Sequence, residues 1–202
     1  MPLWATKQRS IHGERLKLGL WDISHAHFFG TPKRRIFIEL PSEEPRAEGG
    51  EMCGLLQKSM YGTQDAPNIW QSHDSGILIE GGYKRGKSNA SVIYHPQHDV
   101  RVVVHGDDFL ALGDQKHLSK LEDLLRKSYE LKCLGIIGDQ PEDKKEIHFL
   151  NRLIPCGESE GRPAVWIEPD RRHVDLLIQS FGMVNAKGVE SPDEENCRPT
   201  GS

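Results

Sequence analysis

The sequence lacks several features that would assign a protein to a class at once. Its four cysteines lie far apart and form no Cys-x-x-Cys pair, so neither a disulfide framework nor a zinc module is indicated. No apolar run approaches the length of a membrane span, and the first ten residues contain no apolar core of a signal peptide. We therefore expect an intracellular protein, cytoplasmic or nuclear, that does not bind a membrane.

An excess of positive charge is also missing. The chain has 26 Lys and Arg against 30 Asp and Glu, a net charge of −4. This balance argues against a free-standing nucleic-acid binder, although a catalytic core within a longer polypeptide could still be acidic. Short basic clusters at 33–35 and 84–87 are typical of a solvated surface. With 202 residues and 36% hydrophobic residues, one globular domain is expected.

The most informative feature that is present is a pair of adjacent carboxylates, Asp107 and Asp108, between two apolar runs. Residues 100–104 alternate in a strand pattern, residues 109–112 form a second apolar run, and Gly106 suits a tight turn. Side-by-side carboxylates on rigid strands cost free energy unless a cation neutralises them, and Mg²⁺ suits carboxylate oxygens. A polar hairpin turn without a bound cation is the alternative.

The hydrophobic patterns predict strands that alternate with helices. Helices are expected from Pro67 to the Gly81-Gly82 pair, after the N-cap Asp114, and after Pro169. The third helix has an apolar stripe of Val174, Leu177, Ile178 and Phe181. Strands are expected over 16–21, 35–40, 90–94, 100–104, 109–112, 146–154 and 164–167, with loops over 41–51 and 135–145. Hairpins mixed with helices predict an α+β fold with the helices packed on one face of an antiparallel sheet.

Asp22 follows the first predicted strand, as Asp107 and Asp108 follow a later one. If these strands are neighbours in the sheet, the three carboxylates meet at one end of it. This arrangement is typical of two-metal phosphoryl or nucleotidyl transfer.

Three blocks of the sequence occur in the order of a known family. The first runs from Leu20 to Gly30 and on to Ile36–Pro41, with an Asp at the end of a strand, then Ala, aromatics and Gly. The second is Leu56–Trp70, which contains Tyr-Gly-Thr-Gln-Asp-Ala-Pro and matches a Leu-Tyr-Gly-Leu-Lys-Gln-Ala-Pro pattern. The third, Val104–Phe109, is similar to Tyr-Val-Asp-Asp. Together these blocks resemble the reverse transcriptase (RNA-directed DNA polymerase) of copia-type LTR retrotransposons, a part of their Pol polyprotein.

The resemblance implies a reverse-transcriptase palm-like domain over residues 16–192, preceded by a remnant of the fingers in 1–15 and followed by a disordered tail, 193–202. It implies that Asp22, Asp107 and Asp108 are the catalytic and metal-binding residues, with Mg²⁺ or Mn²⁺ as the cofactor. It implies as partners an RNA or DNA template with its primer, dNTPs, and other segments of a Pol polyprotein. It also assigns nucleotide-binding positions, namely His27, Gly62, Gln64, Ala66 and Pro67.

Several departures from the family pattern favour an alternative function. His27 replaces an aromatic residue, Gln64-Asp65 replaces Lys-Gln, and Asn68 replaces an Arg. Most of the fingers, the thumb and the RNase H region also have no counterpart in the chain. The alternative is therefore a catalytically inactive, truncated remnant that acts at most as a binding module.

A second alternative uses histidines as metal ligands. His25 and His27 are spaced to share one face of a strand, and His105 precedes Asp107 by two residues. Such a set could bind Zn²⁺ or Fe²⁺ in a hydrolase or oxygenase. With ten histidines in the chain, scattered surface or core residues explain the same spacing.

Overall fold

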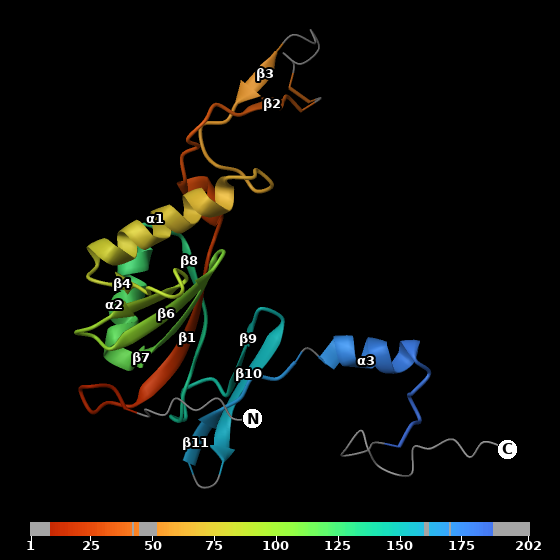
Figure 1. Cartoon of the computed structure of the whole chain (residues 1–202). Coiled ribbons are helices and arrows are strands. Elements are labelled where there is room, and N and C mark those ends of the chain that lie inside the picture. Colours follow the sequence, from red (N-terminus) through yellow and green to blue (C-terminus); the bar gives the residue numbers. More distant parts are fainter. Residues whose placement is uncertain (1–8, 42, 45–51, 160–161, 170, 188–202) are drawn as a thin grey trace, which may run out of the picture.

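The computed structural model describes residues 9–41, 43–44, 52–159, 162–169 and 171–187. These residues form an α+β fold of helices and antiparallel sheets (Figure 1), which confirms the predicted fold class. The helical elements are η1 (Ala26–Phe29), α1 (Ala66–Glu80), α2 (Gln115–Arg126) and α3 (Arg171–Ser180). The strands are β1 (Leu16–Ile23), β2 (Phe37–Glu39), β3 (Cys53–Leu55), β4 (Lys84–Arg85), β5 (Val92–His95), β6 (Val100–His105), β7 (Asp108–Asp114), β8 (Leu131–Ile137), β9 (Glu146–Phe149), β10 (Arg152–Ser159) and β11 (Arg162–Val165).

The main sheet has six strands in the order β4-β5-β6-β7-β1-β8, and every neighbouring pair is antiparallel. The first strand of the chain thus lies in the interior of the sheet, between the second strand of the β6–β7 hairpin and β8. Other elements cover both faces of the sheet at β1, which explains why buried residues lie on both sides of this strand.

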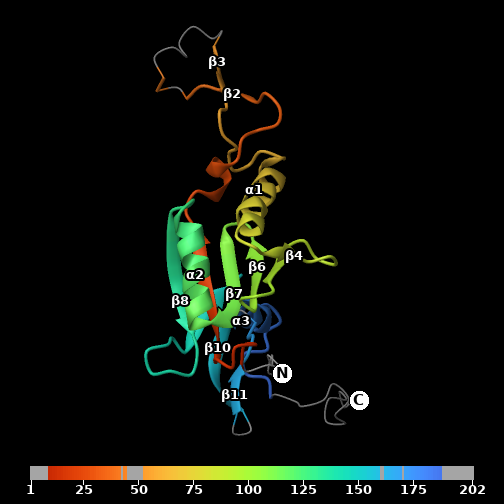
Figure 2. The same ribbon diagram turned by 90° about the vertical axis from the view of Figure 1, so that its left-hand side faces the viewer.

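The two faces of the main sheet are covered differently. On one face, Trp21 and Ile23 of β1 and the buried valines of β6 pack with α1 and α2 in the larger hydrophobic core. On the opposite face, Leu20 packs with Ile147 of β9 and Ile154 of β10, which belong to a separate sheet of the order β11-β10-β9. The predicted packing of helices on one face is therefore confirmed for α1 and α2 (Figure 2).

Both of these helices begin and end near the residues that the sequence indicates. Helix α2 follows Asp114, whose carboxylate accepts a hydrogen bond from the backbone N–H of His117 at 3.0 Å. Helix α1 has Pro67 in its first turn and ends at Gly81, and Gly82 then takes a φ of +91° that favours glycine.

Three predictions about the elements are wrong in part. Residues 135–145 are not all loop, because β8 continues to Ile137 and pairs with β1. The strand predicted over 146–154 is two strands, β9 and β10, that turn at Leu150 and Asn151, both of which have positive φ. Asn151 favours a turn, but Leu150 does not and no glycine follows, so the usual Asn-Gly pair is absent from the sequence.

The third correction concerns α3, which forms but does not pack as its apolar stripe suggests. None of its described side chains is buried, and Leu176, Leu177 and Phe181 are 58%, 57% and 73% exposed. An amphipathic pattern predicts an apolar face but not whether another element covers it.

The β2–β3 hairpin also lies apart from the main sheet, beyond the N-terminal end of α1 (Figures 1 and 2). Within the described parts of the chain, no helix is long and apolar enough to cross a membrane. The predicted disordered tail over 193–202 and residues 1–8 of the predicted N-terminal extension lie outside the described residues.

Four histidine rings gather where the β5–β6 turn meets α2. His95 and His98 stack with their ring centroids 3.7 Å apart, and His98 stacks on His117 at 4.6 Å. His12 lies 4.9 Å from His117. Burial, and then the charges of His95 and Lys120 among others, lower the pKa of His98 to about 4.

This cluster predicts a loss of stability on acidification. His98 has a folded pKa below its usual value of 6.5, so the unfolded chain takes up the proton first and stability falls between about pH 6.5 and 4. We expect the variant His98→Gln to lose less stability than the wild type over this range, measured by urea unfolding at pH 7 and pH 5. The same change at the exposed His148 is the control, and an equal effect there would contradict the assignment.

Candidate active site

The structure brings the three predicted carboxylates to one end of the main sheet. Asp22 of β1 stands directly opposite Asp108 of β7 in the antiparallel register. Asp107 lies in the turn between β6 and β7, and its carbonyl accepts a hydrogen bond from the backbone N–H of Ile23 at 3.0 Å. The turn is therefore attached to the end of β1, which joins the two segments of sequence that carry the carboxylates.

Asp22 and Asp108 project from the same face of the sheet, because opposed residues of antiparallel strands share a face. Their chain neighbours Trp21 and Phe109 are buried on the helix side, so the two carboxylates face away from α1 and α2. All three aspartates are half-buried. A ligand can thus reach them from the side of the sheet opposite the helices.

The same row of the sheet continues with two basic side chains. In register, His105 of β6 is opposite Asp108, and Lys132 of β8 is opposite Asp22. Both are exposed. The sequence did not single out Lys132, because its place in the row depends on β8, a strand that was not predicted and whose last residues were expected to be a loop.

Electrostatic repulsion within the cluster is visible at Asp108. Burial, the charge of Asp107 and the charge of Asp22 raise the pKa of Asp108, while His105 acts in the opposite direction. The carboxylates therefore lie close enough that ionising all three costs free energy. A cation that binds between them would lower this cost.

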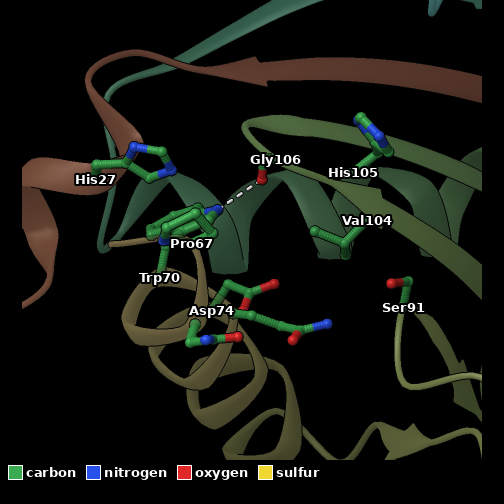
Figure 3. A pocket seen from close by; sticks show the side chains of 10 residues that line it. His27, Pro67, Trp70, Asp74, Ser91, Val104, His105 and Gly106 are labelled. Carbon is green, nitrogen blue, oxygen red and sulfur yellow. Dashed lines mark hydrogen bonds between the residues drawn. The ribbon is translucent and has the colours of Figure 1, made fainter. Parts of the chain in front are cut away.

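A helix holds the carboxylate-bearing turn from the other side. The indole N–H of Trp70 on α1 donates to the carbonyl of Gly106 at 2.6 Å (Figure 3). Gly106 has a φ of +63°, a conformation that a side chain would strain. Trp70 itself is only 2% exposed, so this contact fixes the turn against the core.

The predicted nucleotide-binding residues lie beside this turn but differ in accessibility. His27 of η1 is half-buried, while Gln64, Pro67 and Gly62, which has a φ of +87°, are exposed. Ala66 is 0% exposed, so it could meet a ligand only after a local change.

Tyr61 is a member of the site that the sequence did not single out. Its ring lies 4.3 Å from that of His27. Burial and then the charge of Asp107 raise its pKa, with a smaller contribution from Asp22, which places the phenol near the carboxylates. A Tyr before Gly62 was part of the matched block, so the block contained the signal without assigning it a role.

The donor chemistry of the three carboxylates fits a divalent cation, since two of them face each other, and burial together with the charges of Asp107 and Asp22 raises the pKa of Asp108. Over the described ranges, however, no group of three His, Cys, Asp or Glu side chains is arranged to hold a metal ion.

The alternative with histidines as metal ligands required His25 and His27 to lie on one strand, and the structure has a 3₁₀ helix there. His25 and His27 belong to the η1 turn, where His25 precedes the 3₁₀ helix in the left-handed conformation at φ +57°. His25 stacks on Phe28 with 5.9 Å between ring centroids. The prediction that the two histidines share one face of a strand is wrong.

The negative charge of Asp65, one of the departures from the family pattern, is paired with a nearby positive charge. Arg34 donates to the carboxylate of Asp65 at 3.3 Å and lowers the pKa of that residue. The pair ties the segment after η1 to the start of α1, where Asp65 is the N-cap residue but its side chain makes no capping hydrogen bond.

A buried carboxylate lies one turn along α1 from Trp70. Asp74 is 1% exposed, and burial raises its pKa to about 6 from a usual value of 3.8. Its ionised form is therefore costly in the folded protein.

This cost predicts that Asp74→Asn stabilises the protein. The folded chain binds the proton more tightly than the unfolded chain, so the wild type loses stability as the pH rises from about 4 to 6. At pH 7.5 we expect the variant to unfold with a free energy about 2–3 kcal/mol higher, by denaturant titration. At pH 4 the variant and the wild type should have equal free energies of unfolding. A more stable variant at pH 4 would show that burial of the charge is not the cause.

Comparison with known proteins finds distant similarity to retrotransposon sequences. The chain is 25% identical over 175 residues to the retrovirus-related Pol polyprotein from transposon TNT 1-94 of Nicotiana tabacum, a match that covers 85% of this chain and 12% of the relative. It is also 25% identical over 117 residues to a putative transposon Ty5-1 protein of Saccharomyces cerevisiae, which covers 56% of this chain and 38% of that protein. No protein-family model matches.

The chain is thus distantly similar to copia-type retrotransposon Pol polyproteins, and the predicted resemblance is confirmed at that level. It spans well under half the length of both relatives. The similarity identifies the kind of polyprotein and not one domain within it.

Proposed function

We propose that this chain is a reverse-transcriptase palm-like module of a copia-type Pol polyprotein and that residues 16–192 form that domain. Its reaction would be RNA-directed transfer of a nucleotide from a dNTP to a primer. The single observation that supports this best is the cross-strand pair of Asp22 and Asp108 with Asp107 in the adjoining turn. The sequence similarity adds support, because it covers most of this chain.

In this proposal Asp22, Asp107 and Asp108 would hold Mg²⁺ or Mn²⁺ at one end of the sheet, on the side opposite α1 and α2. Such ions, when bound, activate the primer hydroxyl and stabilise the leaving pyrophosphate. The β6–β7 turn keeps two carboxylates in place through the Trp70–Gly106 hydrogen bond. Lys132 and His105, at the two ends of the row, would attract the anionic phosphates of the dNTP.

His27 and Tyr61 would contact the sugar and base of the incoming nucleotide. Their rings pack against each other next to the carboxylates. The Gly62–Pro67 segment between Tyr61 and α1 would lie against the same nucleotide, and its exposed Gly62 and Gln64 leave room for it. The template, the primer and other segments of the polyprotein are the partners that this role requires.

The test is incorporation of labelled dNTP onto a primed RNA template by the purified chain, with and without Mg²⁺. Incorporation that requires the metal, with pyrophosphate released in equal amount, would support the proposal. A folded protein that neither extends the primer nor binds the primer–template would count against it.

The alternative, an inactive remnant that acts as a binding module, is favoured by one specific observation. The described residues contain no three-membered group of side chains arranged for a metal ion. Saturable binding of primer–template without any incorporation, at every Mg²⁺ and Mn²⁺ concentration tested, would favour this alternative.

A further inference from the structure

A pocket of about 210 Å³ lies between the first half of α1 and the end of β6, behind the carboxylate-bearing turn. Figure 3 shows Asp74 on the side of α1 that faces the strand. The exposed rim includes Pro67, Asn68, His105 and Gly106. The pocket thus deepens from an exposed rim to a buried wall of Trp70, Asp74 and Val104.

The buried wall of this pocket carries an acceptor without a donor. One carboxylate oxygen of Asp74, Oδ1, accepts a hydrogen bond from the hydroxyl of Ser75 at 3.3 Å. The other, Oδ2, has no hydrogen-bond partner in the described part of the chain. Arg85 donates to the hydroxyl of Ser75 and to the carbonyl of Gln71.

A buried acceptor left unpaired costs free energy, and the cost is larger for a charged group. A ligand that donates an N–H to Oδ2 would recover this cost, and a ligand cation would also neutralise the charge. We propose that this pocket is a binding site for a small organic cation that carries N–H donors, such as an amidinium or guanidinium group on a compact ring.

The remaining walls fit the same chemical class. Trp70 and Val104 present apolar surface against which a planar ring can pack, and an aromatic wall favours a cation. Gln71 and Ser91 offer polar atoms near the carboxylate. Anionic ligands such as nucleotide phosphates are disfavoured in the depth of the pocket by Asp74, although His27, Pro67 and His105 line both this pocket and the proposed nucleotide site.

The indole N–H of Trp70 would show whether a ligand occupies the site. The indole N–H of Trp70 donates to Gly106 and Trp70 lines the pocket, so a bound ligand would change the environment of that proton. This readout needs no polymerase activity, and the inference therefore stands or falls independently of the proposed function.

The experiment is a titration of the ¹⁵N-labelled full chain with benzamidine at pH 7.5, followed by the Trp70 indole N–H signal in ¹H–¹⁵N spectra. The signal is assigned by its loss in Trp70→Phe. Neutral benzamide, which has nearly the same shape, is titrated in parallel. Asp74→Asn removes the charge from the pocket, and Asp123→Asn makes the same change at an exposed position on α2.

We expect a saturable shift with a Kd of about 1 mM or tighter in the wild type and in Asp123→Asn. Binding to Asp74→Asn should be at least about tenfold weaker, and benzamide should not bind the wild type. Equal binding of benzamide and benzamidine, unaltered binding to Asp74→Asn, or no shift in the wild type would each overturn the inference. The benzamide comparison uses the wild type alone, so the test does not depend on how the variant folds.

Discussion

Replacing Asp107 by asparagine is expected to abolish Mg²⁺-dependent primer extension. The change removes one charge from the carboxylate cluster while keeping the shape of the side chain and the backbone carbonyl that bonds to Ile23. A metal-dependent transfer that loses one carboxylate ligand should slow by about 10²- to 10³-fold or more. The measurement is the initial rate of dNTP incorporation on a primed RNA template at saturating Mg²⁺.

The matched control is Asp123→Asn, because it changes the same charge at an exposed position on α2. Its rate should equal that of the wild type. Urea unfolding of both variants would separate a loss of chemistry from a loss of fold. Extension that survives Asp107→Asn at the wild-type rate would remove the assignment of the carboxylates.

The second large effect is expected in the core behind the site. Trp21 is 0% exposed, and its ring lies over Gly19, where any side chain would collide with it. Trp21→Ala should leave a cavity between β1 and the helices and lower the free energy of unfolding by about 3–5 kcal/mol. Denaturant unfolding followed by circular dichroism measures this difference.

Two further substitutions show whether lost packing causes the loss of stability in Trp21→Ala. Trp21→Phe should cost less than Trp21→Ala, since it keeps most of the ring and removes an indole N–H that has no partner among the described residues. Trp166→Ala alters a half-buried tryptophan outside the main core and should cost much less. Equal losses in Trp21→Ala and Trp166→Ala would contradict the assigned core.

The elements that the sequence predicted best are those whose local signals agree with their packing. Helix α2 has the N-cap Asp114 followed by a strongly amphipathic run, and helix α1 has Pro67 in its first turn and Gly81 directly after its end. The sequence placed Asp22 near Asp108 only if their strands were neighbours in the sheet. It could not show that they are, because β1 and β7 are distant in the chain.

The features that the sequence could not predict depend on tertiary context. The turn at Leu150 and Asn151 contains a turn-favouring residue, Asn151, but lacks the glycine that usually accompanies it, so a hairpin was predicted as a single strand. The exposed face of α3 has the same periodicity as a packed one. Asp74 lies four residues from both Trp70 and Leu78, so the helical spacing allows it on the buried face of α1, but an aspartate is rarely fully buried and its residue type argues for solvent.

The carboxylate cluster is the centre of the proposed function, and divalent-cation binding tests it most directly. Free Mn²⁺ gives an electron paramagnetic resonance signal that disappears on binding, so titration counts the ions bound per chain. The wild type is compared with the double variant Asp22→Asn/Asp108→Asn, and with Glu122→Gln/Asp123→Asn on α2 as a control of equal charge. We predict saturable Mn²⁺ binding, displaced by Mg²⁺, in the wild type and the control but not in the double variant. Equal Mn²⁺ binding by all three proteins would contradict a cation site at the end of β1 and β7.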